Sequence, residues 1–412
     1  MIKEFFKRYT IFPANYKITV GIIFPILLLI IISLMILFAA NPNSFQLNSF
    51  FGKQSVWFGV SIVAFLIVQS IKPHFFYENA YILYGFLILA IISTYLFESV
   101  GGSSRWIKLG AIQFQPSEIG KMIVVFALAK FLTDLRNLSS VYKTITLSFI
   151  LTGIPALLVF KQPDLGTALV YIFATIPMLI WRGYKLSNLF VVFGPFISII
   201  AASNIIFFSI WMGFVVFVLY YTRPKLINAI GVFISNIIFG TITTLIWNSL
   251  YPHQKNRILI FLDPTKDPMG AGYQIIQSKT AIGSGGLFGV GLGNGTQTQL
   301  RFLPVRNSDF IISVIGEEFG LLGISAILIC FGIIIYWMIN YAQITRNQFG
   351  SLSIIGFSSI IFFHTLVNMG MAVGLFPVTG LPLPFISYGG TFLLSMFLII
   401  GITQNFINNN FR

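Results

Sequence analysis

The chain has 412 residues, of which 56% are hydrophobic and only 9% are charged, and its formal net charge is +14. A soluble globular surface needs roughly a quarter charged residues, so this composition excludes a soluble domain and indicates a polytopic membrane protein. The single cysteine, Cys330, excludes an intrachain disulfide and a thiolate metal cluster.

Twelve apolar runs are predicted to be membrane spans, and the first five are each close to the roughly 20 residues that a helix needs to cross a bilayer. The predicted spans cover residues 17–39, 55–71, 77–97, 117–132, 144–160, 167–180, 188–206, 207–221, 226–250, 309–339, 353–373 and 391–405. Residues 188–221 are almost unbroken apart from Ser203 and Asn204, so they could also form one long broken helix. We expect an all-α, polytopic helical bundle that forms a single integral domain over residues 1–412.

The distribution of charge gives the expected orientation. Basic residues are more frequent in the connections on the side of the N-terminus, which the positive-inside rule assigns to the cytoplasm. Most carboxylates, Glu118, Asp164 and Asp309 among them, then fall toward the outer side. The outer face is therefore predicted to be the working face.

The first polar site follows the third predicted span. Arg105 and Trp106 come after a Gly/Ser turn, although a membrane interface by itself also selects Trp. Glu118 and Lys121 lie a turn inside the next span, where they form either a plain i,i+3 ion pair or the lining of a polar cavity. Ionisable groups inside a bilayer are costly, so we favour the cavity.

A second polar site, residues 161–167, separates two later spans. It contains Asp164 between a proline and a glycine, which both interrupt helices. Asp164 could face the outer side with the other polar loops, or it could simply cap the next helix. The sequence leaves these two possibilities open.

The long extracytoplasmic loop 251–308 is basic and rich in glycine. Lys279, Arg301 and Arg306 could neutralise a phosphate group. The glycine run 283–295 is typical of a flexible loop, but it also suits a hinged lid or backbone amides that approach an anion. It matches no Walker or dinucleotide fingerprint.

Three polar features occupy the last third of the chain. Asp309 is either the N-cap of the following helix or a partly desolvated carboxylate that accepts a proton from a bound hydroxyl. His364 and Asn368, four residues apart in a late span, are predicted to form interhelical hydrogen bonds. Residues 376–390 hold several prolines, which predicts either a stiff cavity wall or a plain rigid connection.

Seven motifs together resemble the SEDS family of bacterial shape, elongation, division and sporulation proteins, in the family's order and over nearly the whole chain. They are RW at 105–106, QPSEIGK at 115–121, QPDLGT at 162–167, DPMGAGYQ at 267–274, GTQ at 295–297, SDFI at 308–311 with GEE at 316–318, and PLPFISYGG at 382–390. The forms at 162–167 and 267–274 are closer to the RodA branch than to the FtsW branch.

The resemblance implies a peptidoglycan glycosyltransferase that polymerises lipid II at the outer face of the bacterial cytoplasmic membrane. Its expected partners are undecaprenyl-pyrophosphate-linked glycan, membrane lipid and a class B penicillin-binding protein, with no nucleic acid. Asp309 occupies the position of the family's essential loop carboxylate and would be the general base. The substrate-binding candidates are Arg105, Trp106, Glu118, Lys121, Asp164, Lys279, Gln297, Arg301, Arg306 and Ser387.

The same resemblance implies how the leaving diphosphate would be stabilised. Four basic residues would share that task, alone or with a divalent cation, Mg or Mn. They are Lys121, Lys279, Arg301 and Arg306.

The sequence departs from the family in two places. Val305 replaces a common Glu, which removes one carboxylate that a cation could use, and Ser308 replaces a common Thr. The family usually has ten spans, so we expect a two-span insertion around 188–221. Two rival functions stay open, a transporter of lipid-linked oligosaccharide and a scaffold that only docks the transpeptidase.

Overall fold

The computed structural model describes residues 19–39, 46, 49–97, 105–109, 112–135, 141–202, 204–223, 226–249, 271–300, 302 and 307–409. Within these residues a long helix lies at each of the twelve predicted spans. The helices are α2 (Val20–Ala39), α3 (Phe50–Gln69), α4 (Pro73–Ser93), α5 (Pro116–Asp134), α6 (Val141–Lys161), α7 (Leu165–Trp181), α8 (Leu186–Ala201), α9 (Ile205–Thr222), α10 (Leu226–Ser249), α14 (Ile311–Ile344), α15 (Gln348–Ala372) and α16 (Gly390–Asn408).

Length and composition identify the bundle as a membrane protein. Among the described residues, eight helices are long and apolar enough to cross a bilayer, and α7 is a shorter apolar helix. α5 has the position expected of a span, but it carries four charged residues. Two of them are Glu118 and Lys121, and the other two lie near its C-terminal end. The all-α membrane fold is therefore confirmed.

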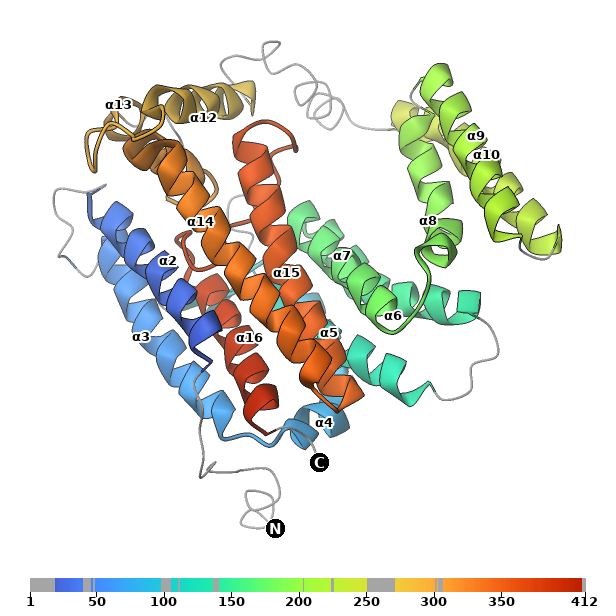
Figure 1. Cartoon of the computed structure of the whole chain (residues 1–412), viewed down its shortest axis with the longest axis horizontal. Coiled ribbons are helices and arrows are strands. Elements are labelled where there is room, and N and C mark those ends of the chain that lie inside the picture. The colour runs from blue at the N-terminus through green and yellow to red at the C-terminus, as the bar shows by residue number, and fades with distance from the viewer. Residues whose placement is uncertain are drawn as a thin grey trace.

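Short elements connect the long helices. A 3-10 turn, η1 (Thr94–Leu96), follows α4, and the strands β1 (Ile107–Leu109) and β2 (Ile112–Phe114) form an antiparallel pair before α5. Two further helices, α12 (Ala271–Gly285) and α13 (Thr296–Gln299), lie across one end of the bundle (Figure 1). We call this end the α12 end.

The polar connections meet at the α12 end. The last residue of α15 there, Ala372, accepts a hydrogen bond from Ser278 of α12 at 2.6 Å. Gly166, at the start of α7, packs against the backbone of Thr379 in the loop after α15. The start of α7, the middle of α12 and the loop after α15 are thereby brought to one side.

The core of the bundle is formed by α15 and α16, which are the most enclosed of the spanning helices. Aromatic rings from four helices meet there, with Phe126 of α5 stacked on Phe76 of α4 and on Phe349 of α15. Phe406 of α16 contacts the same group edge-on. Packing of this kind makes the central helices a rigid frame for the loops at their ends.

Helices α8, α9 and α10 form a group at one side of the bundle (Figure 1). The chain breaks between α8 and α9, where Asn204 caps α9 by accepting from the amide of Ile206 at 2.8 Å. Residues 188–221 therefore form two separate helices and not one long broken helix. The group contacts the bundle through α6 and α8, whose Phe149 and Phe193 rings lie 4.3 Å apart.

A buried polar cluster joins these three helices. The Ser198 hydroxyl donates to Asn236 Oδ1 at 2.7 Å, and the Trp211 indole N–H donates to Ser198 Oγ at 2.9 Å. Each helix contributes one member. Such bonds between helices are an ordinary way to fix a membrane bundle.

The glycine run fastens α12 to a kink in α14. Gly320 takes φ 65° inside α14, and a Cβ on Gly289 would lie 2.2 Å from the carbonyl oxygen of Glu318. The amides of Val290 and Gly291 donate to the carbonyls of Glu317 and Glu318 at 3.0 and 3.1 Å. These amides are therefore committed to the chain itself, which argues against the expectation that they approach an anion.

Candidate active site

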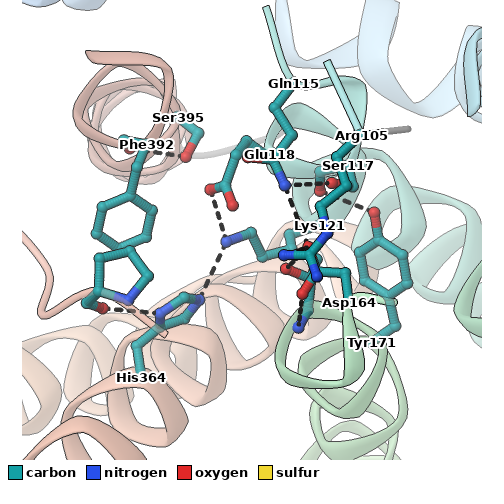
Figure 2. A network of polar contacts seen from close by, with 12 residues as sticks. Arg105, Gln115, Ser117, Glu118, Lys121, Asp164, Tyr171, His364, Phe392 and Ser395 are labelled. Atoms are coloured by element: carbon teal, nitrogen blue, oxygen red, sulfur yellow. Dashed lines mark hydrogen bonds and ion pairs between the residues drawn. The ribbon is translucent and has the colours of Figure 1, made fainter. Parts of the chain in front are cut away.

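A buried ion pair lies at the α12 end of α5 (Figure 2). Lys121 Nζ is 2.7 Å from Glu118 Oε2 and 3.0 Å from His364 Nε2 of α15. Both lysine and glutamate are nearly inaccessible to solvent. The Lys121 ammonium also lies 4.9 Å above the Phe392 ring of α16, so three helices surround this one charge.

The lysine fixes the tautomer of His364. An ammonium group has no acceptor, so Nε2 must accept from Lys121 and the ring proton must be on Nδ1. Nδ1 then donates to the carbonyl of Pro382 at 3.0 Å. The ion pair therefore supports the proline-containing loop after α15.

The turn between α6 and α7 lies beside this cluster. Asp164 caps α7 by accepting from the amide of Thr167 at 3.1 Å, and Gln115 donates to its other oxygen at 3.1 Å. Arg105 donates to the carbonyls of Gln162, at 2.9 Å, and Pro163, with its guanidinium 3.8 Å from Asp164. Asp164 thus caps α7 and also lies beside the polar segment that contains Arg105 and Gln115, so the two possibilities left open for it hold together.

The turn 307–310, immediately before α14, carries Asp309. Asn368 of α15 donates to the carbonyls of Asp309 and Leu381 at 2.9 and 2.8 Å, so it joins this turn to the proline-containing loop. Ser387 donates to the carbonyl of Ser308 at 2.5 Å. The backbone of Asp309 is therefore held from two sides. His364 forms the predicted interhelical hydrogen bond, to Lys121 of α5, whereas Asn368 bonds to a turn and a loop.

The Asp309 carboxylate has a different setting from its backbone. The N-cap of α14 is Phe310 and has no side-chain cap bond, so the helix-cap interpretation of Asp309 is wrong. The Asp309 carboxylate faces Gly380, since its Oδ2 lies 3.7 Å from the position that a Cβ on Gly380 would take. Within the described residues this carboxylate forms no ion pair. Burial raises the pKa of the Asp309 carboxyl, and a hydrogen bond from Ser308 opposes part of that rise.

Gln297 and Lys279 lie on the layer formed by α12 and α13. The buried Glu317 carboxylate accepts from the amides of Gln297 and Thr298 at 2.8 and 3.0 Å, and it thereby caps α13. Lys279 is exposed and packs its ammonium against Gly374, just after α15. Neither residue contacts the buried ion pair.

The predicted site residues thus fall into separate groups. Arg105, Glu118, Lys121 and Asp164 belong to one buried network, whereas Asp309 and Ser387 share a turn-to-loop junction. Trp106 is half-buried next to β1. Arg301, Arg306 and Val305 lie outside the described residues.

The described residues offer no preformed metal site. No three His, Cys, Asp or Glu side chains gather in this part of the chain. Glu317 is used by the amides of α13, and Glu118 by Lys121. A requirement for Mg or Mn stays a prediction, which polymerisation assays with and without a chelator would test.

Sequence reasoning did not include two contributors among the site candidates. His364 and Glu317 bind the loops that flank Asp309, and both are polar residues inside apolar helices. A polar residue inside an apolar helix is a sign of a structural or functional role, and this sign was visible in the sequence. Their partners, the amides of α13 for Glu317 and the Lys121 side chain and Pro382 carbonyl for His364, could not be foreseen because they are distant in sequence.

Comparisons with known proteins agree with this arrangement. The family of cell cycle proteins that includes FtsW, RodA and SpoVE matches residues 14–212 and 202–410. The peptidoglycan glycosyltransferase MrdB of Escherichia coli K12 is 34% identical over 349 residues, 84% of this chain and 82% of that protein. The peptidoglycan glycosyltransferase RodA of Treponema pallidum is 30% identical, over 91% of this chain and 94% of its own length.

Solved structures show the same fold. A chain from a peptidoglycan synthase complex that coordinates polymerization and crosslinking superposes with a TM-score of 0.75 at 26% identity, covering 97% of this chain and 99% of that chain. RodA of Thermus thermophilus superposes with a TM-score of 0.64 at 24% identity, with the same coverage. The chain therefore belongs to the SEDS family, that of the FtsW, RodA and SpoVE cell cycle proteins.

Proposed function

We propose that the chain is a peptidoglycan glycosyltransferase that polymerises lipid II during cell-wall elongation. The names of its relatives support the reaction, because MrdB and RodA are both described as peptidoglycan glycosyltransferases. The bundle supplies what a lipid-linked substrate needs, spanning helices with polar loops gathered at one end.

Asp309 is the proposed general base, and its setting is the observation that carries this assignment. The carboxylate is neither a helix cap nor, among the described residues, part of an ion pair, while its backbone is fixed by Asn368 and Ser387. A base must be placed precisely and must keep its lone pairs free for the substrate.

In the proposed reaction, Asp309 takes the proton from the acceptor sugar hydroxyl. The oxygen attacks the anomeric carbon of the donor, undecaprenyl pyrophosphate leaves with the electron pair of the broken bond, and the configuration inverts. Lys279, exposed on α12, together with Arg301 and Arg306, would stabilise the charge on the diphosphate. Lys121 is buried and paired with Glu118, so it would reach the diphosphate only if that pair opened.

The proposed location is the bacterial cytoplasmic membrane, with the α12 end facing outward. The proposed partner is a class B penicillin-binding protein that crosslinks the new strands. The match to a chain from a synthase complex that couples polymerization to crosslinking supports such a partner.

The test is polymerisation of lipid II by purified protein in detergent. Asp309→Asn keeps the size of the side chain but removes the base, and we expect the rate to fall at least about 100-fold. Asp134→Asn is the matched control, since Asp134 accepts from Tyr77 at the opposite end of α5 and Asn can still accept. Polymerisation by Asp309→Asn at the wild-type rate would refute the assignment. Detergent has no two sides, so polymer formation there also separates a polymerase from a transporter.

A further inference from the structure

An apolar loop, residues 286–292, joins α12 to the approach of α13 and is exposed. Leu287 is 60% exposed, Phe288 is 78% exposed and Leu292 is 41% exposed. The segment reads GLFGVGL and contains no charged residue. A cluster of large apolar side chains of this kind, if it faced water, would be a strong signal of an interaction surface.

The backbone fixes this loop beside a spanning helix. Leu321 and Leu322, the first residues after the kink in α14, donate their amides to the carbonyls of Gly286 and Leu287 at 2.9 and 3.2 Å. Both leucines are more than half exposed, so each of the two segments joined by these bonds carries exposed apolar side chains.

The level of the loop relative to the bilayer follows from helix lengths. Residues 321–344 of α14 extend roughly 36 Å as a helix, more than the roughly 30 Å of a hydrocarbon core, so this part spans the membrane by itself. α2 ends at Ala39, whose Cβ is 3.9 Å from where a Cβ on Gly293 would lie. Two spanning helices thus reach the membrane boundary at the loop.

We propose that loop 286–292 inserts into the lipid leaflet at the α12 end, with Leu287 and Phe288 among the acyl chains. The occupant of this surface is lipid because the surface continues the lipid-facing side of α14 and carries no charge. The inserted loop would fix the height of the layer formed by α12 and α13 relative to the membrane. Ser278 of α12 bonds to Ser313 at 2.6 Å, and Phe310 packs on Ala281, so α12 and the Asp309 turn move together.

The experiment measures the depth of single nitroxide labels in proteoliposomes of phosphatidylethanolamine and phosphatidylglycerol. The chain has one cysteine, Cys330, so Cys330→Ser gives a background for Phe288→Cys. Thr280→Cys, on the exposed side of α12, is the aqueous control, and Ile329→Cys, 61% exposed on α14, is the lipid control. Accessibility to oxygen and to a water-soluble nickel chelate is read for each label.

We expect collisions of the nickel chelate with the label at 288 to be at least about threefold fewer than at 280, with oxygen accessibility close to that at 329. Leu292→Cys, labelled in the same way, gives a second reading if Phe288→Cys does not fold. A label at 288 as accessible to nickel as the label at 280 would overturn the proposal. So would a label shielded only after a transpeptidase is added, because the surface would then belong to a protein partner.

Discussion

Two sets of carboxylates at the α12 end differ in how their charge is balanced. Glu118, Asp164 and Glu317 each have a cation or several hydrogen-bond donors from the chain itself. Asp309 has only the Ser308 side chain among the described residues, although its backbone is firmly held. A balanced carboxylate maintains the structure, whereas a fixed and unbalanced one remains available to a substrate.

The largest effect is expected when a balanced carboxylate, Glu118, loses its cation. Lys121→Met would leave Glu118 buried without its cation, and loss of one partner of a buried pair costs about 3 to 5 kcal/mol. Thermal unfolding in detergent would show a large drop in Tm. The double variant Glu118→Gln with Lys121→Met should recover most of that loss. If the single variant is as stable as the wild type, the pair does not hold the helices together.

The next effect concerns the glycine contacts that join α12 to α14. Gly289→Ala would place a methyl group 2.2 Å from the Glu318 carbonyl at φ +79°, and we expect a loss of about 2 kcal/mol in the free energy of unfolding. Gly153→Ala in α6 is the matched control, because a Cβ there meets nothing within 4 Å. Equal stability of both variants would show that loop 286–292 is not fixed to α14.

A third prediction uses the unbalanced carboxylate. Its pKa is raised in the fold, so the contribution of Asp309 to stability is present below its unfolded pKa and is lost as pH rises through the folded pKa. At pH 7 Asp309→Asn should therefore have a higher free energy of unfolding than the wild type, by about 1 kcal/mol, while losing activity. The gain should vanish near pH 4, about the ordinary pKa of Asp. A variant that is less stable at pH 7 would show that the charge is balanced after all.

The smallest effect on activity is expected in helices α8 to α10, which lie far from both sets of carboxylates. Asn236→Leu removes the bonds of α10 to Ser198 and Trp211, each worth about 0.6 kcal/mol in a membrane bundle. Polymerisation should stay within about twofold of the wild type, since a loss of that size falls on a group of helices that, among the described residues, contacts the bundle where Phe193 of α8 meets Phe149 of α6. A severe loss of activity would place α8 to α10 in the working part of the enzyme.

Most of the long helices could be predicted from their apolar length, and the break near Asn204 was marked by polar residues. Which acids are balanced could not be predicted, because it depends on contacts between distant segments. For Glu118 and Lys121 the i,i+3 spacing offered an ion pair as the alternative to the polar cavity that we favoured, and the structure shows the pair, buried. His364, 243 positions away in the sequence from Lys121, completes that cluster. The glycine run gave no sign that its amides bind α14, since the carbonyls of a helix normally bond within it.

The most direct test of the account is the pH dependence of lipid II polymerisation by the wild type and by Asp309→Asn. The wild-type rate should fall with decreasing pH through an apparent pKa above the ordinary value for Asp, because the protonated carboxyl cannot accept the hydroxyl proton. The small remaining rate of Asp309→Asn should lack this acid limb. A variant that keeps both the wild-type rate and the acid limb would contradict the assignment of Asp309 as the base.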